Sequence, residues 1–290
     1  MNRAPDVLSC VRPGIIQIQI SYSPFREYNF DGGFPPGTSS CSLLHGILNM
    51  TTLEPVVAFQ APPGELLCAY NRRIPASQQS TSIPRVLCDA MTVREMVFVQ
   101  EQKAISLPHH LDPDDARSYH WVIYAPASDD PTSGDSKQHP IGTIRLVPYP
   151  HTPHPEPEAS YKAPSEDSPV EESELFFRRP PPEYQVDRAT SLHDGKEPYL
   201  KLGRLCVVKE FRGKKLGDVL IRAALKWAGE NPNFGIEGLP EWKGLVCAQA
   251  QERAVTTWLR NGFVIDKAMG SWNTIGIKHY GLFHRLDVQN

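Results

Sequence analysis

The residues best suited to binding or catalysis lie in one segment, 201–221, which reads KLGRLCVVKEFRGKKLGDVLI. A strand rich in β-branched residues passes through a short basic turn containing Gly213 directly into a helix. The first N–H groups of a helix have no carbonyl partner of their own, and the helix dipole is positive at that end. Arg212, Lys214 and Lys215 add positive charge at the same place. The segment therefore predicts a binding corner for an anion, above all a phosphate group.

The six cysteines predict no second kind of chemistry. They show neither the CxxC spacing nor the nearby paired histidines of a zinc site, so we expect no bound metal. Cys206 and Cys247 fall on predicted central strands, where an acyl-cysteine intermediate would need an activating base. No His or Asp is adjacent to either residue in the sequence. We interpret both as reduced core thiols.

The composition limits the class of protein. The chain has 290 residues, with 40% hydrophobic and 22% charged side chains, which excludes collagen-like, coiled-coil and wholly disordered proteins. A net charge of -3 gives no global attraction to nucleic acid or to anionic membranes. No apolar stretch is long enough to span a membrane, and residues 15–20 alternate apolar residues with Gln, unlike a signal peptide. We expect a cytoplasmic protein with no nucleic-acid or membrane partner.

The periodicity of apolar residues predicts alternating strands and helices. Apolar spacing typical of helices occurs in three segments, 84–102, 211–232 and 251–263. Seven segments are typical of strands: 56–59, 120–126, 140–150, 199–208, 244–250, 263–265 and 278–286. The pattern predicts an α/β (α+β) class, with a mixed sheet flanked by helices.

Two segments differ in composition from the rest. Residues 1–49 are rich in Gly, Pro and Ser and predict a poorly ordered extension, so that the domain covers 50–290. Residues 148–198 are rich in Pro, Glu and Ser and predict a flexible insertion within the domain. Within the insertion, LFFRRPPPEY at 175–184 could dock as a hydrophobic contact point or serve as a Pro-rich ligand for a partner.

The segment 201–221 resembles the acetyl-CoA-binding signature of the GNAT superfamily of N-acetyltransferases. Arg212, Gly213 and Gly217 match the usual R-G-x-G-x-G form, while Lys215 stands where the middle glycine is usual. A positive φ at that position is costly for Lys, whereas a helical conformation tolerates it. Residues 250–263 resemble the second cofactor-contacting helix of the family, with Gln251 at a matched position.

The resemblance covers residues 53–286 apart from the insertion, and the flanking segments resemble the ElaA-like branch. It implies a GNAT-like mixed, splayed sheet of about seven strands, with helices on both faces and acetyl-CoA bound where two central strands diverge. Backbone amides would hold the pyrophosphate and strand residues would pair with the pantetheine arm. The cofactor-binding residues that it implies are Cys206, Val207, Val208, Arg212, Gly213, Lys214, Lys215, Leu216, Gly217, Asp218 and Gln251.

The activity that the resemblance implies is acetyl transfer from acetyl-CoA to a primary amine by direct attack. Deprotonating a lysine-like amine at pH 7 costs about 4 to 5 kcal/mol, so a base or a water chain is needed. The candidate catalytic residues are His279, in the matched closing strand, and Glu101. Trp258 stands where many members have an acidic Tyr, and we interpret it as a packing residue.

The acceptor is less well defined by the sequence. Asp112 and Asp115 could attract a cationic amine, or they could cap a helix. Arg145 and Arg204 lie on predicted strands and are interpreted as partners in structural ion pairs. We expect a small-molecule amine such as an amino sugar, a polyamine or an arylamine. A protein N-acetyltransferase and a non-catalytic CoA-binding or partner-binding module stay open, as does a homodimer.

Overall fold

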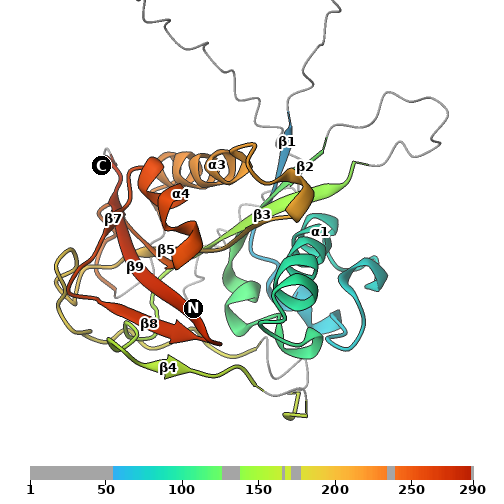
Figure 1. Cartoon of the computed structure of the whole chain (residues 1–290), viewed down its shortest axis with the longest axis horizontal. Coiled ribbons are helices and arrows are strands. Elements are labelled where there is room, and N and C mark those ends of the chain that lie inside the picture. Colours follow the sequence, from blue (N-terminus) through green and yellow to red (C-terminus); the bar gives the residue numbers. More distant parts are fainter. Residues whose placement is uncertain (1–54, 126–137, 165–166, 171–177, 234–238, 289–290) are drawn as a thin grey trace, which may run out of the picture.

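The computed structural model describes residues 55–125, 138–164, 167–170, 178–233 and 239–288 (Figure 1). The predicted N-terminal extension, 1–49, lies outside the described residues. Among those described, nine strands form one mixed sheet in the order β1-β2-β3-β5-β6-β9-β8-β4, with β7 paired to β9. The strands are β1 (Val56–Gln60), β2 (Tyr119–Tyr124), β3 (Pro140–Val147), β4 (Ser160–Tyr161), β5 (Leu200–Val207), β6 (Leu245–Gln251), β7 (Val264–Ile265), β8 (Ser271–Thr274) and β9 (Ile277–Arg285).

The helices are α1 (Arg85–Arg94), which continues as a wider π-type turn over Glu95–Glu101, α3 (Leu216–Glu230) and α4 (Val255–Arg260). Short helical turns occupy Leu107–His109 and Pro113–Arg117. The predicted mixed sheet flanked by helices is confirmed. The seven predicted strands correspond to β1, β2, β3, β5, β6, β7 and β9. The sequence missed β4 and β8 because both are too short to show alternation.

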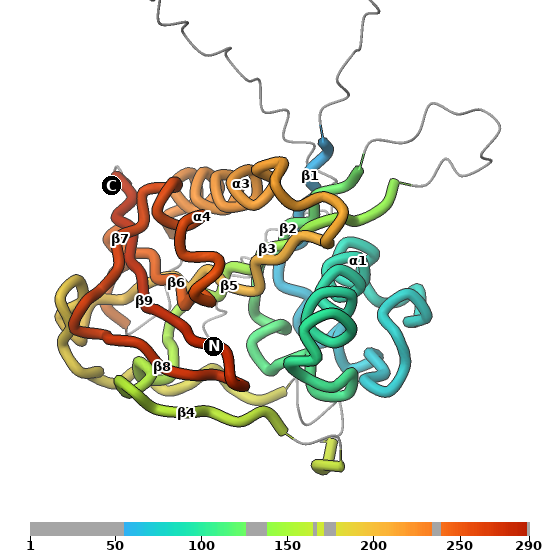
Figure 2. The backbone as a smooth tube through the Cα atoms, viewed as in Figure 1, coloured from blue at the N-terminus to red at the C-terminus, as the bar shows by residue number. Residues whose placement is uncertain are grey.

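Helices cover both faces of the sheet. On β2, Val122 and Tyr124 pack with Ala90 of α1 in one buried cluster. The alternate residues Trp121 and Ile123 belong to the main core cluster, which contains the apolar residues of α3. Successive side chains of a strand point to opposite faces, so α1 and α3 lie on opposite sides (Figures 1 and 2). The buried stripe of α3 explains why this segment forms a helix against the sheet.

The described parts of the insertion contact the sheet and the residues next to it. Its strand β4 pairs in parallel with β8, and the two run side by side in Figure 2. The rings of His151 and His154 stack on Tyr199, with centroids 4.7 and 5.4 Å apart. The His154 backbone N–H donates to Asp187 Oδ2 at 2.6 Å. A few aromatic contacts and satisfied polar groups anchor a segment whose average composition is polar.

Candidate functional site

Two neighbouring parallel strands separate at the centre of the sheet. β5 and β6 pair only where Leu200–Leu202 faces Val246–Ala248. Beyond that point β5 continues to Val207 and β6 to Gln251, while β5 stays paired with β3 on its other side. The edge of β5 that faces β6 is therefore left with backbone groups available to an extended ligand.

A bulge in β5 marks the point of separation. The pairs Thr143–Cys206 and Arg145–Gly203 enclose one residue on β3 but two on β5. Arg204, one of the two, has a φ of +53°, in the left-handed region. An extra residue bends a strand and increases its twist. The bulge therefore turns the end of β5 away from β6.

A cavity of about 500 Å³, which we call the splay cavity, fills the space between the separated strands. It is bounded by β5, by the turn that leads into α3, by the start of α4 and by the π-type turn. Eight of the predicted cofactor-binding residues line it: Cys206, Val207, Arg212, Gly213, Lys215, Leu216, Gly217 and Gln251. The sequence motif and the cavity thus coincide, although no ligand is present to test those contacts.

The turn at 212–217, which we call the phosphate corner, presents free backbone donors. The N–H of Arg212 donates to the Lys209 carbonyl at 3.3 Å, and that of Asp218 to the Lys215 carbonyl at 3.0 Å. Between them, the N–H groups of 213–217 have no hydrogen-bond partner among the described residues. Converging N–H groups at a helix start bind anions.

Lys215 adopts a left-handed conformation that its side chain disfavours. Its φ is +57° and its ψ is 21°, so it takes the conformation of the usual glycine and not a helical one. Gly213 also has a positive φ, of 80°. A non-glycine residue in this region costs about 1 kcal/mol or more. The corner therefore keeps its shape at some cost, which is common where a backbone must meet a ligand.

Three predicted cofactor-binding residues do not line the splay cavity. The N–H of Val208 donates to the Ile141 carbonyl at 2.9 Å, so this donor is already paired with the other side of the sheet. Lys214 lies with its ammonium 5.0 Å from the centroid of the Phe211 ring. The buried carboxylate of Asp218 accepts hydrogen bonds from Arg260 and Asn261. Asp218 therefore ties α3 to α4, and orients Arg260 beside the cavity.

The sequence interpretation missed one wall of the splay cavity. Val97, Phe98 and Gln102 line it from the π-type turn. Gln251 Nε2 donates to Gln102 Oε1 at 3.0 Å, which bridges the cavity from β6 to this wall. The apolar spacing of 84–102 indicated a helix, and a core position for Val97 and Phe98, but not the sheet edge to which they are exposed. Basic residues that the sequence left unassigned also border it, namely Arg253 and Arg260.

Glu101 is engaged by the signature arginine. Arg212 donates to both carboxylate oxygens, at 2.7 and 2.5 Å, and also to the Val207 carbonyl at 2.9 Å. The hydrogen bonds from Arg212 lower the pKa of Glu101. A carboxylate of lowered pKa is a weak proton acceptor, so the geometry favours a positioning role over the catalytic role expected from the sequence.

His279 lies on β9, directly opposite Gln251 of β6. Paired residues of antiparallel strands share one face of the sheet, so His279 faces the same side as Gln251. Its Nδ1 is 2.8 Å from the Ile277 carbonyl, which assigns the proton to Nδ1 and leaves Nε2 as the acceptor. Burial lowers its pKa, and the nearby charge of Arg204 acts in the same direction. Its ring, stacked on Trp272, is therefore neutral at pH 7.

Trp258 and the two strand cysteines have the surroundings of packing residues. Trp258 is buried and meets the Phe263 ring edge-on at 4.9 Å between centroids. Burial raises the pKa of the Cys206 thiol to about 12 and does the same for Cys247. A thiol of such high pKa is not a nucleophile at pH 7.

Asp112 and Asp115 do not offer free carboxylates to a cationic amine. Asp115 is fully buried and pairs with Arg94 and Arg145, both at 2.7 Å. Asp112 pairs with Arg145 at 2.6 Å and with Arg204 at 2.5 Å. The two aspartates also form a reciprocal capping box at the Pro113–Arg117 turn. The capping and ion-pair interpretations describe this cluster, and the substrate-binding expectation loses its physical basis because the charges are neutralised.

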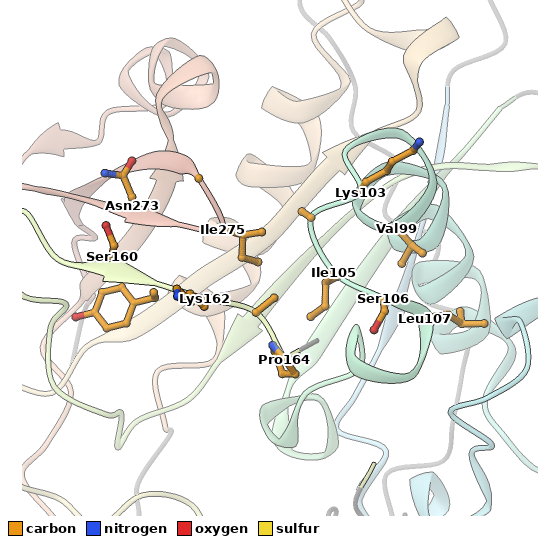
Figure 3. A pocket seen from close by; sticks show the side chains of 14 residues that line it. Val99, Lys103, Ile105, Ser106, Leu107, Ser160, Lys162, Pro164, Asn273 and Ile275 are labelled. Carbon is orange, nitrogen blue, oxygen red and sulfur yellow. The ribbon is translucent and has the colours of Figure 1, made fainter. Parts of the chain in front are cut away.

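Two further cavities adjoin the site. One, of about 920 Å³, lies between the 99–107 segment, the 160–164 part of the insertion and the β8–β9 hairpin. Figure 3 shows Ile105, Lys162 and Ile275 on these three walls. The other, of about 540 Å³, lies against β3 and β5 beside the Arg204 bulge. We call them the hairpin cavity and the arginine cavity.

Neither a metal centre nor a membrane span is found in the part of the chain that the structure describes. Its His, Cys, Asp and Glu side chains form no group of three that could hold a metal ion. None of its helices has the length and hydropathy needed to cross a bilayer.

The comparisons with known proteins found several similar solved structures and one family match. The chain is similar in structure to a presumed N-acetyltransferase from Lactobacillus plantarum (20% identity, 70% of this chain and 92% of that one, TM-score 0.41). It is also similar to an acyl-CoA N-acyltransferase from Pseudomonas aeruginosa, with 16% identity, coverage of 80% of this chain and 99% of that one, and a TM-score of 0.41. For Escherichia coli ElaA the identity is 17%, the coverage is 73% of this chain and 96% of that one, and the TM-score is 0.39. No curated protein matches the chain. Residues 94–263, more than half of the chain, match the Acetyltransferase (GNAT) family. The chain therefore belongs to the GNAT acetyltransferase family and is an acyltransferase.

Proposed function

We propose that the protein is an acetyl-CoA-dependent N-acetyltransferase that acetylates the primary amine of a small molecule. The observation that carries the proposal is the meeting of the phosphate corner with the separated strands β5 and β6 in one cavity. A corner rich in free N–H groups binds an anion, and an unpaired strand edge binds an extended chain. Coenzyme A consists of these two parts, and it supplies the acetyl group as a thioester.

The phosphate corner would hold the pyrophosphate. Five successive residues, 213–217, offer N–H groups that have no hydrogen-bond partner in the described part of the chain. Lys215 and Arg253 border the same cavity and add positive charge. The apolar wall at Val97 and Phe98 fits the methylene groups of a pantetheine arm. The residues of this cavity therefore suit both the charged and the extended parts of the molecule.

The residues after the bulge would polarise the acetyl carbonyl. Leu205, Cys206 and Val207 line the splay cavity on the strand edge that β6 leaves open. A fixed backbone donor aimed at a developing oxyanion contributes about 3 kcal/mol to transition-state stabilisation. The rigid pairing of β5 with β3 keeps such a donor in place without reorganisation.

His279 would accept the amine proton. It is neutral at pH 7, its Nε2 is available as an acceptor, and it shares a sheet face with Gln251, which borders the splay cavity. Glu101 has a lowered pKa and is held by Arg212, so it is the weaker candidate. Proton transfer by a positioned base typically contributes a hundredfold or more to the rate.

The experiment that tests the proposal is a panel assay with free-thiol detection. Purified protein is incubated with acetyl-CoA and one acceptor at a time. The acceptors are small primary amines and peptides bearing a free N-terminus or a lysine. We expect thiol release with at least one class of small amine, and a correspondingly acetylated product by mass spectrometry. Tight binding of acetyl-CoA with no thiol release from any acceptor would contradict the proposal and support the non-catalytic alternative.

A protein N-acetyltransferase is the second candidate. The observation that favours it is the hairpin cavity, whose volume of about 920 Å³ exceeds the needs of a small amine. The same panel separates the two functions, because acetylation confined to peptides would select this one.

A further inference from the structure

The arginine cavity carries an excess of positive charge beside the point where the strands separate. Among the described residues, its walls hold five cationic side chains, Arg117, Arg145, Arg179, Lys201 and Arg204. Only two carboxylates line it, those of Asp112 and Asp114. Even with Arg179 left out of the balance, four positive charges in a concave site with two negative ones create a field that attracts anions.

Two aspartates at or behind the wall of this cavity, Asp112 and Asp115, each pair with two arginines. Asp112 serves both Arg145 and Arg204, and buried Asp115 serves Arg94 and Arg145. Even so, Nε of Arg145, a residue only 7% exposed, has no hydrogen-bond partner among the described residues. A buried donor without a partner costs about 1 to 3 kcal/mol. The cluster therefore keeps unsatisfied hydrogen-bonding capacity at the cavity wall.

Lys201 strengthens the case for a missing anion. This partly buried residue begins the cavity wall on β5, and its ammonium has neither an ion pair nor a hydrogen bond within the described part of the chain. Burial lowers its pKa, the charges of Cys247 and Asp114 partly oppose this, and those of Arg145 and Arg204 lower it further. An anion bound in the cavity would offset that cost.

The position of the cavity links it to the acceptor. Lys201, Gly203 and Arg204 of β5 line the arginine cavity, whereas the next residues, Leu205–Val207, line the splay cavity. On β6, Gln249 lines the arginine cavity and Gln251 lines the splay cavity. The bulge thus separates two adjoining cavities along the same pair of strands. Pro180–Pro182 of the insertion also line the arginine cavity.

We propose that the arginine cavity binds an anionic group, a carboxylate or a phosphate, of the acceptor whose amine is acetylated. The proposal rests on the proposed function and refines it: the substrate is a small molecule with an amine and an anion on one short skeleton. Polyamines and other purely cationic acceptors are disfavoured by the same charges.

The test compares two matched pairs of acceptors at saturating acetyl-CoA. β-Alanine against β-alaninamide examines a carboxylate, and phosphoethanolamine against ethanolamine examines a phosphate. We expect kcat/KM for at least one anionic member to exceed that of its neutral partner tenfold or more. The pair that shows this difference identifies the anion as a carboxylate or a phosphate. Equal or better use of both neutral members would overturn the proposal.

Lys201→Met provides the matched variant. It should remove the tenfold advantage of the anionic members, while Lys201→Arg should keep that advantage. Lys226→Met, on the exposed face of α3, serves as a control that changes the same charge at a distance. If Lys201→Met and wild type discriminate equally, the assignment of Lys201 to the anion is wrong.

A binding measurement separates the failure of this proposal from the failure of the proposed function. With CoA saturating the phosphate corner, calorimetric titration with inorganic phosphate and with β-alanine should show binding that Lys201→Met weakens at least tenfold. Binding without acetylation of any amine would leave the anion site standing and refute the enzyme function. Acetylation of neutral amines without anion binding would support the enzyme function and refute the anion site.

Discussion

The phosphate corner and the arginine cavity lie on either side of one bulge, and both favour anions by different means. The corner uses the N–H groups of five consecutive residues. The cavity uses side chains from β3, β5, the Pro113–Arg117 turn and the insertion. Backbone donors are fixed by local conformation, whereas the side-chain cluster exists only once the sheet has formed. The phosphate corner is therefore encoded locally in the sequence, whereas the arginine cavity depends on the whole fold.

The largest expected effect comes from breaking the side-chain cluster. Asp115→Ala should lower the free energy of unfolding by about 3 to 5 kcal/mol, because it leaves Arg94 and Arg145 buried without their shared carboxylate. Urea denaturation measures this. Asp114→Ala removes a more exposed partner of Arg117 and should cost less than about 1 kcal/mol. Equal losses in the two variants would contradict the account.

The cluster also predicts a loss of stability in acid. Burial opposes ionisation of Asp115, but Arg94 and Arg145 outweigh it and hold its pKa well below the usual range. A group with a lowered folded-state pKa stabilises the protein above its unfolded pKa, near 3.9 for Asp, and less as pH falls toward the folded value. The wild type should therefore lose stability below about pH 4. Asp115→Ala should lose less over the same range.

The corner is tested by filling it. Gly217 lies at the start of α3, and a Cβ there would be 3.4 Å from Thr257 Cγ2 of α4, so a large side chain must enter the cavity. Gly217→Trp should weaken acetyl-CoA binding about a hundredfold, or about 2.7 kcal/mol, as measured by calorimetry. Gly229→Trp, in the same helix with open space around its Cβ, is the matched control and should bind normally.

The proposed proton acceptor, His279, is tested by removing its imidazole. His279→Ala should lower kcat about a hundredfold with little effect on acetyl-CoA affinity. An imidazole acts as a base only in its neutral form, and burial lowers the pKa of this one below 6.5. In the wild type kcat/KM should therefore stay level above pH 6.5 and fall as pH drops through the lowered pKa. A variant with wild-type rates across the pH range would return His279 to a structural role.

The smallest effect is expected at the Glu101–Arg212 pair, where the side chains are 31% and 38% exposed. Exposed ion pairs contribute about 0 to 1 kcal/mol, so Glu101→Gln should change the free energy of unfolding by less than that. It should also keep most of the turnover, because it removes a contact to Arg212 and no base. A hundredfold fall in kcat would instead identify Glu101 as the proton acceptor.

The sequence predicted the corner because its chemistry is local. A strand, a turn with Gly213 and a helix are consecutive in the chain, so their order specifies the donors and their direction. The same local information did not reveal that Lys215 would take a positive φ, since both a left-handed and a helical conformation were open to it. The fold class followed from periodicity for the same reason, and only the short strands β4 and β8 escaped it.

The arginine cavity was out of reach of the sequence. Asp112 and Asp115 were open to two interpretations because nothing in their neighbourhood shows that Arg145 and Arg204, distant in the chain, would converge on them. The contacts of the described parts of the insertion were out of reach for a related reason. Its average composition is polar, but Tyr199 stacks with His151 and His154, and such specific contacts do not appear in an average.

The central claim is that the backbone amides of the phosphate corner hold the pyrophosphate of acetyl-CoA. Titration of ¹⁵N-labelled protein with acetyl-CoA, followed by amide NMR, tests it most directly. The account predicts that the signals of residues 213–217 shift and saturate together, while the Val208 amide, already bonded to Ile141, shifts less. Binding that leaves the 213–217 amides unchanged would contradict it.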